Sequence, residues 1–395
     1  MAPALDIKPF VFPEAGKSLE EIRNWMAKHV RLAGPGLYEI PLQYQLTDPE
    51  TVVKERYANR LDYVRTMAAI LRGAGYTADI VFATIDSGDT QAQRDRNMYQ
   101  YPNVGRFNQA LVKVTLDKTP WWKKVLTLGL GERQLERYYL GLENEYTPIG
   151  ATDYSYSHYF NPADDTFNVA YGMSEYDGYV TENTTIEVKE DASVDMSVVS
   201  VTAGTGVGSM RKQYAEMLPE DKSRHYQQLL SHYSSAAVAM SELKVDTEAY
   251  PARLEFSCHI PDYTLVKDGS ITVTIPDYYT QLFPLSEPAR LNPIGIAAHG
   301  RRTTVYKVVF PEGYTVVERL PEAYKIADPQ TGTGTWYENF VTTKMEDGRL
   351  VVYVWREEWG HGATMLSKDF VGLLKDWSRI GSSRGNRTIC IRKEQ

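Results

Sequence analysis

The stretch from residue 60 to residue 74 has apolar side chains at spacings of three and four. This spacing places a continuous apolar stripe on one face of a helix. Gly73 and Gly75 close the stretch, and glycine is common at the C-terminal end of a helix. Ala78 to Ala83 then predict a strand at the foot of the helix. The stripe consists of Leu61, Val64, Met67, Ala68, Ile70, Leu71 and Ala74.

Capping residues mark where the helices of this region begin. A first amphipathic helix is predicted from Lys17 to His29, with Ser18 as its N-cap. Asp48 and Pro49 are predicted to begin the helix that carries Arg60, because proline is favoured at the first helical position. The polar stretch 86–106 shows no periodicity and predicts a long loop near a cleft.

From Asp177 onward the pattern changes to alternating apolar and polar residues, which predicts strands. A helical insert from Ser209 to Tyr233, broken at Pro219, interrupts them. The sequence Glu346-Asp347-Gly348 lies between two alternating runs and predicts a hairpin turn. A late helix is predicted at 368–380. The predicted strands are 184–189, 194–201, 241–245, 252–259, 270–276, 303–310, 315–318, 340–345, 349–355 and 387–392.

Length and composition are those of an ordinary globular protein. With 395 residues, the chain is long enough for two or three domains. A net charge of -8 argues against a nucleic-acid partner, which usually meets a basic face. No apolar run approaches the length of a membrane-spanning helix, and the first residues lack the order of a signal peptide.

The helix at 60–73 and the following sequence LRGAGYTADIVFA resemble the core of the transglutaminase-like superfamily, whose architecture is related to that of papain. Enzymes of this family carry a Cys-x-Asp motif at the start of the helix. The matching residues here are Arg60, Leu61 and Asp62, so arginine replaces the nucleophilic cysteine. Arginine offers no usable nucleophile at neutral pH, and its charge opposes the helix dipole that favours a thiolate.

The resemblance implies that the other two catalytic positions have changed as well. The family's histidine opens a strand about fifty residues later, and Gln109 holds that place in the sequence Phe107-Asn108-Gln109. Glutamine cannot shuttle a proton near neutral pH. The family's aspartate corresponds to Gly141, or to Glu143 if the register slips by two residues. The resemblance therefore predicts a vestigial site at Arg60, Asp62, Gln109, Gly141 and Glu143, with no catalytic residue.

The later strands resemble the β-domains that follow this core in a family of bacterial envelope proteins of unassigned function. The expected fold class is α+β, with a transglutaminase-like core followed by two antiparallel β-sandwich-like domains, the first with a helical insert. The expected domains are 1–175 for the core, 176–285 for the β-domain with the insert, and 286–395 for a C-terminal β-domain with one helix. Those relatives also carry a β-domain ahead of the core, which this chain starts too late to include.

Other residue patterns carry little chemistry. Cys258 and Cys390 could pair in an oxidising compartment, but both lie in strand-like segments, which favours two buried free thiols. Cys258 and the adjacent His259 should point to opposite faces of a strand. No paired cysteines and no His-Glu-x-x-His motif are present, so neither a metal nor a cofactor is expected. Tyr154, Tyr156 and Tyr159 predict packing beside the cleft, or a stacking patch for a sugar or peptide.

Two classes of function remain open. The first is a catalytically inactive binding or scaffolding protein for a peptide, a protein or a cell-envelope glycan. In this protein Arg60 pairs with an acidic group of the ligand, and Gln109 holds a peptide carbonyl. The second is an active amide-bond hydrolase or transferase that uses other residues, with Asp62, Glu143 or His158 as candidates. The resemblance implies a periplasmic or extracellular location, and the missing signal leaves a cytoplasmic one open. The oligomeric state is not predicted.

Overall fold

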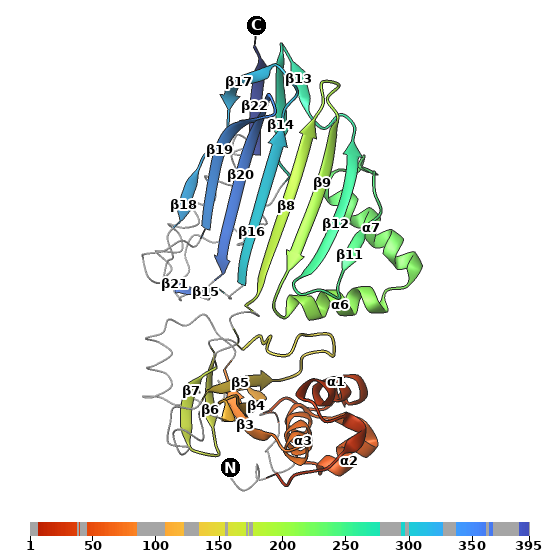
Figure 1. The fold of residues 1–395 in the computed structure, drawn as a ribbon, viewed down its shortest axis with the longest axis vertical. Coiled ribbons are helices and arrows are strands. Elements are labelled where there is room, and N and C mark those ends of the chain that lie inside the picture. The colour runs from red at the N-terminus through yellow and green to blue at the C-terminus, as the bar shows by residue number, and fades with distance from the viewer. Residues whose placement is uncertain are drawn as a thin grey trace. The chain divides into compact units, whose positions relative to one another are not determined.

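The protein is described by a computed structural model, and it is a mixed α+β protein, as the two periodicities predict (Figure 1). Contacts divide the chain into two compact units. The first contains Met1–Ser87, Gln91–Gly178 and Gly204–Lys212, and the second contains Gly88–Thr90, Tyr179–Ala203 and Gln213–Gln395. The structure describes residues 7–37, 39, 46–84, 107–121, 134–154, 157–170, 173, 177–276, 294–296, 300–326, 337–360, 363–365 and 387–394.

The helices of the first unit begin at residues suited to capping. In α1 (Leu19–His29), Ser18 and Glu21 form a complete capping box, which satisfies two backbone N–H groups that the helix itself leaves unpaired. The prediction of this helix and of its N-cap is confirmed. A short 3-10 helix, η2 (Pro13–Ala15), precedes it. Two further helices follow, α2 (Pro49–Glu55) and α3 (Arg60–Gly73).

The prediction that Asp48 and Pro49 begin the helix carrying Arg60 is wrong. They begin α2, which ends where Arg56 takes up a left-handed backbone conformation with φ of 62°. Strand β2 (Tyr57–Ala58) then pairs in parallel with β1 (Arg31–Leu32), and Asn59 caps α3 as a separate helix. Pairing between these distant segments breaks the helix, which local sequence could not reveal.

A five-stranded antiparallel sheet accompanies these helices in the first unit (Figure 1). The buried face of α3 contacts β3 and β4, and their apolar side chains form one core with those of α1 and α2. A smaller cluster around Leu111 and Tyr159 packs separately, with Tyr154 against it. In sheet order, the strands are β5 (Leu135–Leu140), β4 (Gln109–Asp117), β3 (Thr77–Ala83), β6 (His158–Asn161) and β7 (Thr166–Val169).

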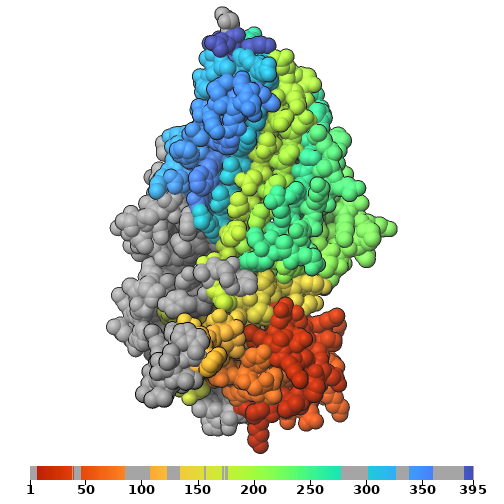
Figure 2. Space-filling model, viewed as in Figure 1, coloured from red at the N-terminus to blue at the C-terminus, as the bar shows by residue number. Residues whose placement is uncertain are grey.

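The second unit is built on a nine-stranded sheet whose central strands come from distant parts of the chain. Figure 1 shows β8 beside β16, and in Figure 2 the yellow-green surface of the first of these segments meets the blue surface of the last third of the chain. The order is β10 (Val238–Ala239), β12 (Ala252–Ile260), β9 (Val194–Thr202), β8 (Tyr179–Val188), β16 (Gly300–Val309), β20 (Arg349–Gly360), β19 (Tyr337–Glu346) and β18 (Tyr324–Ile326), and β11 (Lys244–Asp246) pairs with β12.

This sheet joins the two β-domains that the sequence analysis places at 176–285 and 286–395. Strands β8 and β16 pair in parallel over nine residue pairs, from Arg301–Tyr179 to Val309–Glu187. Both predicted β-domains therefore share one sheet and one compact unit, and the boundary at 285 does not separate them. Parallel pairing requires a long connection and is specified by distant side chains, so the alternating pattern alone cannot reveal it.

The second unit also contains a four-stranded sheet and the second helix of the helical insert, whereas most of the insert's first helix belongs to the first unit. The four strands are β13 (Leu265–Lys267), β14 (Ser270–Thr274), β22 (Thr388–Lys393) and β17 (Tyr314–Arg319). Their apolar residues share a core with the nine-stranded sheet. The helical insert is α6 (Gly206–Glu216) and α7 (Pro219–Tyr233), with the predicted break at Pro219. A two-stranded sheet pairs β15 (Ile294–Ile296) with β21 (Ala363–Met365).

Several smaller predictions have clear outcomes. Asp347 and Gly348 both have positive φ, 48° and 77°, which is the hairpin turn expected between β19 and β20. Both thiols are free, but Cys390 is only partly buried. No helix in the described part of the chain is long and apolar enough to span a membrane. The predicted loop at 86–106 and the helix at 368–380 lie outside the described residues.

Candidate functional site

Arg60 and Gln109 meet at the N-terminal end of α3. Asn59 is the N-cap, and its side chain accepts a hydrogen bond from the Asp62 backbone N–H at 2.8 Å. Arg60 is the first helical residue, and its side chain is exposed. Its Nη1 donates to Gln109 Oε1 at 3.1 Å. The structure therefore brings together two of the residues that the sequence predicts for the site.

Gln109 is held from two sides at the start of β4. Its Oε1 accepts from Arg60 and also lies 3.4 Å from the hydroxyl of Tyr154. Its Nε2 lies 3.4 Å from Asn108 Oδ1, at the long end of hydrogen-bonding distance. The amide is thus oriented with its oxygen toward the guanidinium, which leaves its nitrogen as a donor for a ligand.

Asp62 serves the fold rather than a ligand. The residue is 1% exposed. Its carboxylate accepts hydrogen bonds from the Thr47 backbone N–H at 2.8 Å, from Asn59 Nδ2 at 3.0 Å and from Arg65 Nη1 at 3.1 Å. These donors satisfy the buried charge and tie the first turn of α3 to the chain that precedes α2. The structure gives no sign that Asp62 acts as a catalytic acid.

The side chain of Glu143 folds back onto the backbone of Gly141, and both residues belong to the predicted site. Its Oε2 accepts a hydrogen bond from the Gly141 backbone N–H at 2.6 Å. Its Oε1 has almost no solvent-accessible surface and no hydrogen-bond partner among the described residues. A Cβ built on Gly141 would lie 3.4 Å from that oxygen, 3.2 Å from Tyr154 Cε2 and 2.9 Å from Leu111 Cδ2. The space beside Gly141 is therefore already filled by these three side chains, and Leu111 would have to move to admit a Cβ.

Burial dominates the electrostatics of Glu143. Removing its carboxylate from water raises its pKa to about 7, although the backbone N–H groups of Glu143 and Gly141 and the charge of Arg23 act in the opposite direction. Asp153 raises the pKa further by charge repulsion. A carboxyl group that changes its charge near neutral pH is a feature of functional sites, as well as of buried structural carboxylates.

Tyr154 connects Glu143 with Gln109 and Arg60. Burial raises the pKa of its hydroxyl to about 12, with further contributions from the charges of Glu143 and Asp153. The positive charge of Arg60 acts in the opposite direction. Tyr154 therefore lies within the electrostatic range of both Arg60 and Glu143. Of the predicted tyrosine cluster, Tyr159 is buried against Tyr139, and Tyr156 lies outside the described residues.

Arg23 is a buried arginine that supports the loop containing Glu143, and it is not among the residues predicted for the site. It is 2% exposed, and its Nη2 donates to the carbonyl oxygen of Thr147. Burial lowers its pKa, while the charge of Glu143 acts to raise it. A sequence signal existed, because Arg23 follows Leu19 by four residues and precedes Met26 by three, on the apolar face of α1. Tyr154, by contrast, belongs to the tyrosine cluster that the sequence predicts to pack beside the cleft.

The first unit has no thiol, because the chain's only cysteines, Cys258 and Cys390, belong to the second unit. Its histidines are His29 and His158. His29 stacks on Trp25, and His158 is buried in β6, which β3 separates from the strand that carries Gln109. Cysteine–histidine chemistry at the start of α3 therefore has no residues to perform it within this unit.

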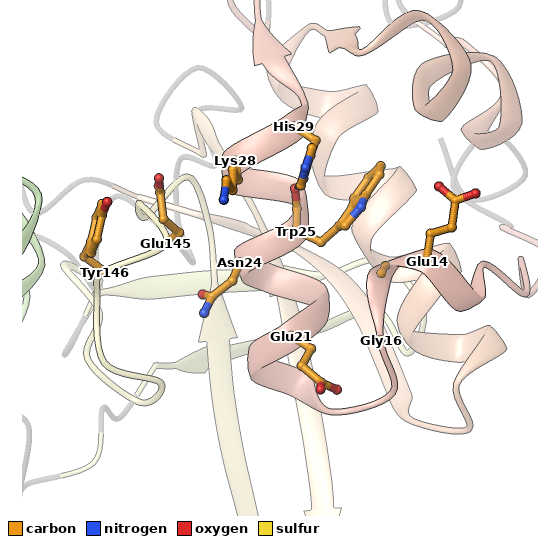
Figure 3. Close-up of a pocket in the computed structure, with 10 residues that line it drawn as sticks. Glu14, Gly16, Glu21, Asn24, Trp25, Lys28, His29, Glu145 and Tyr146 are labelled. Carbon is orange, nitrogen blue, oxygen red and sulfur yellow. The ribbon is translucent and has the colours of Figure 1, made fainter. Parts of the chain in front are cut away.

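A cavity of about 520 Å³ along α1 is a weaker candidate (Figure 3). Trp25, its largest side chain, already stacks on His29 and lies beneath the guanidinium of Arg56 at 4.6 Å. Glu21 is occupied in the capping box. In Figure 3 the labelled side chains of α1 point in different directions around the helix and do not converge. The cavity is lined by Glu14, Ala15, Gly16, Glu21, Asn24, Trp25, Lys28, His29, Glu145 and Tyr146.

Within the part of the chain that the structure describes, no three His, Cys, Asp or Glu side chains come together in a way that could hold a metal ion. The acids of the candidate site also have local partners. Asp62 binds Arg65, and Asp153 Oδ1 accepts from Thr205 Oγ1 at 2.6 Å. The polar groups that the site offers to a ligand are therefore those of Arg60, Gln109 and Tyr154.

Comparison with known proteins yields little. No protein-family model matches the chain, and no curated protein matches it. Among solved structures, the chain is similar to the crystal structure of a "putative protease" from Parabacteroides distasonis ATCC 8503, with 12% sequence identity and a TM-score of 0.39. The match covers 94% of this chain and 51% of that protein, so the chain spans about half of its length. A likeness of this size carries no conclusion about the fold or activity of this chain.

Proposed function

We propose that the first unit is a transglutaminase-like domain without catalytic activity, which binds an extended peptide through an acidic group. The hydrogen bond between Arg60 Nη1 and Gln109 Oε1, 3.1 Å long, is the observation that carries this proposal. It joins the start of a helix to the start of a strand at the two positions where the family has its cysteine and histidine. Here these positions hold two hydrogen-bonding groups and no nucleophile.

The chemistry of the pair suits a carboxylate. A guanidinium has five N–H donors arranged as a fork that matches a carboxylate, and Arg60 uses one nitrogen toward Gln109. The N-terminal end of α3 adds a partial positive charge that favours an anion. The Nε2 group of Gln109 can donate to a neighbouring peptide carbonyl. A side-chain acid followed by a peptide carbonyl would therefore satisfy both residues.

A glycan with a carboxylate would satisfy Arg60, but an uncharged glycan would not. We therefore favour peptide over glycan, and a test with both ligand classes distinguishes them.

A periplasmic or extracellular location forms part of the proposal, since it rests only on the resemblance to bacterial envelope proteins. Fractionation of cells that produce the full-length protein would test it.

The binding proposal is tested with labelled peptides of equal length that differ by one Glu-to-Gln exchange. Fluorescence polarisation of the full chain should detect tighter binding of the acidic peptide. Arg60→Ala should weaken that binding by at least about tenfold, because a charge-assisted hydrogen bond is lost. Gln109→Ala should weaken both peptides alike, because it removes an uncharged donor.

Arg31→Ala is the matched control, since it removes another exposed arginine from the same unit. It should leave both affinities unchanged. Equal binding of the acidic and neutral peptides, or an equal loss in the Arg60 and Arg31 variants, would refute the proposal. Selective binding of an acidic glycan with the same dependence on Arg60 would replace peptide by glycan as the ligand.

An active amide-bond hydrolase is the second candidate, and Glu143 is the observation in its favour. A buried carboxyl group with a pKa near 7 can exchange a proton at neutral pH, as a general acid or base must. Mass spectrometry of a peptide mixture incubated with the chain would reveal cleavage. Cleavage that survives alkylation of both cysteines but is lost in Glu143→Gln would establish this alternative.

A further inference from the structure

Four side chains form a continuous path from the surface of the first unit to its interior. Arg60 is exposed and donates to Gln109 Oε1, which also lies 3.4 Å from the hydroxyl of Tyr154. The ring of Tyr154 then approaches the space beside Gly141. A Cβ built on Gly141 would lie 3.2 Å from Tyr154 Cε2 and 3.4 Å from Glu143 Oε1. Tyr154 thus lies close to Gln109 at its hydroxyl and close to Gly141 at its ring, and it feels the charges of both Glu143 and Arg60.

The inner end of this path contains a carboxyl group that is only half satisfied. Glu143 Oε2 accepts from the Gly141 backbone at 2.6 Å, whereas Oε1 is shielded from water and has no partner among the described residues. An ionised carboxylate in that position leaves a charged oxygen unpaired, which is costly, whereas a protonated carboxyl group avoids most of that cost. The charged and titratable groups near Glu143 are Arg23, Tyr63, Glu145, Asp153 and Tyr154, with Arg60 beyond Tyr154.

We propose that the protonation state of Glu143 controls how well the Arg60–Gln109 site accepts an acidic ligand. The inference rests on the proposed binding function and assigns its regulation to a residue that does not itself contact the ligand. With a proton on Glu143, the only full charge along the path is that of Arg60. Without the proton, a negative charge behind Tyr154 opposes the negative charge of an incoming carboxylate.

The direction of the effect follows from simple electrostatics. Burial raises the pKa of Glu143 to about 7, so the change in charge falls near neutral pH. The carboxylates of a peptide are already ionised throughout that range. Affinity for an acidic peptide should therefore fall by a few-fold as the pH rises from about 6 to about 8, because a repulsion of about 1 kcal/mol between two charges changes an affinity by roughly that factor.

The test measures fluorescence polarisation of the acidic peptide with the full chain at about pH 6 and about pH 8. The Glu143→Gln variant keeps the size and the Gly141 contact but carries no charge at either pH. It should bind with the higher, acidic-side affinity at both. Tyr154→Phe removes the hydroxyl that reaches Gln109 and should weaken binding without abolishing the pH dependence. Glu145→Gln, in the same loop, is the control for a change of one charge.

Infrared spectroscopy gives a readout that requires no ligand. A carboxylic C=O band that disappears between about pH 6 and about pH 8, and that Glu143→Gln lacks, is expected. The inference is overturned if this band is missing, or if Glu143→Gln and wild-type chains lose affinity equally as the pH rises. A peptide that binds through Arg60 without pH dependence leaves the binding function standing and removes only the inference. No selective binding at any pH removes both.

Discussion

Replacing Glu143 with glutamine should change how the stability of the first unit depends on pH. In the folded chain, burial raises the pKa of Glu143 from its ordinary value of 4.5 to about 7. A carboxyl group whose folded pKa exceeds its unfolded pKa stabilises the fold fully only below the unfolded value. That contribution is lost as the pH rises through the folded pKa.

The magnitude follows from the size of the shift. Each pKa unit corresponds to about 1.4 kcal/mol, so the wild-type unit should lose up to about 3 kcal/mol of unfolding free energy between pH 4.5 and a pH above 7. Glutamine stays uncharged, so the Glu143→Gln variant should not show this loss. Relative to wild type, the variant should therefore gain stability as the pH rises, even if its absolute stability at low pH is slightly reduced.

Hydrogen exchange measured by mass spectrometry is the suitable assay, because the chain has two units and need not unfold in one step. Peptides from α3 and β4 report on the first unit alone. Exchange at those peptides should speed up from about pH 5 to about pH 8 in wild type, after correction for intrinsic exchange, and less so in Glu143→Gln. Glu145→Gln controls for the altered net charge. Parallel pH dependences in wild type and Glu143→Gln would refute the assignment of the raised pKa.

Three further outcomes are expected from the described contacts. Asp62→Asn should lower the unfolding free energy of the first unit by about 2 to 4 kcal/mol, measured by hydrogen exchange at peptides from α3 and β4, because it removes the buried charge that pairs with an arginine. Gly208→Ala should cost about 1 to 3 kcal/mol in the same assay, because the added Cβ would lie 2.8 Å from a backbone atom of the loop after β5. Gly178→Ala, which meets nothing within 4 Å, should have little effect by comparison. Cys258 is buried, and burial raises its pKa to about 11, so it should resist alkylation in the folded chain and react only after unfolding. The partly buried Cys390 should react sooner, and mass spectrometry distinguishes the two thiols.

The candidate site was predictable only in part. Arg60 and Gln109 could be found because each lies at a fixed place in a local pattern, one at a helix start and one at a strand start. Their hydrogen bond spans 49 residues of sequence, so only the folded chain could show it. The role of Asp62 as a structural acceptor depends on Thr47, which lies before α2, and the local pattern contained no sign of that contact.

The sequence by itself determined the elements that local physical chemistry specifies. The capping box at Ser18, the apolar stripe of the helix that ends at Gly73, the break at Pro219 and the turn at Asp347 each depend on residues a few positions apart. Only the tertiary structure decided what lies beside what. The parallel pairing of β8 with β16 joins segments more than a hundred residues apart, and it made one unit of two predicted domains. The tertiary structure also decided the environment of Glu143, whose Oε1 is buried without a hydrogen-bond partner among the described residues, because burial is a property of the surrounding fold that local sequence does not encode.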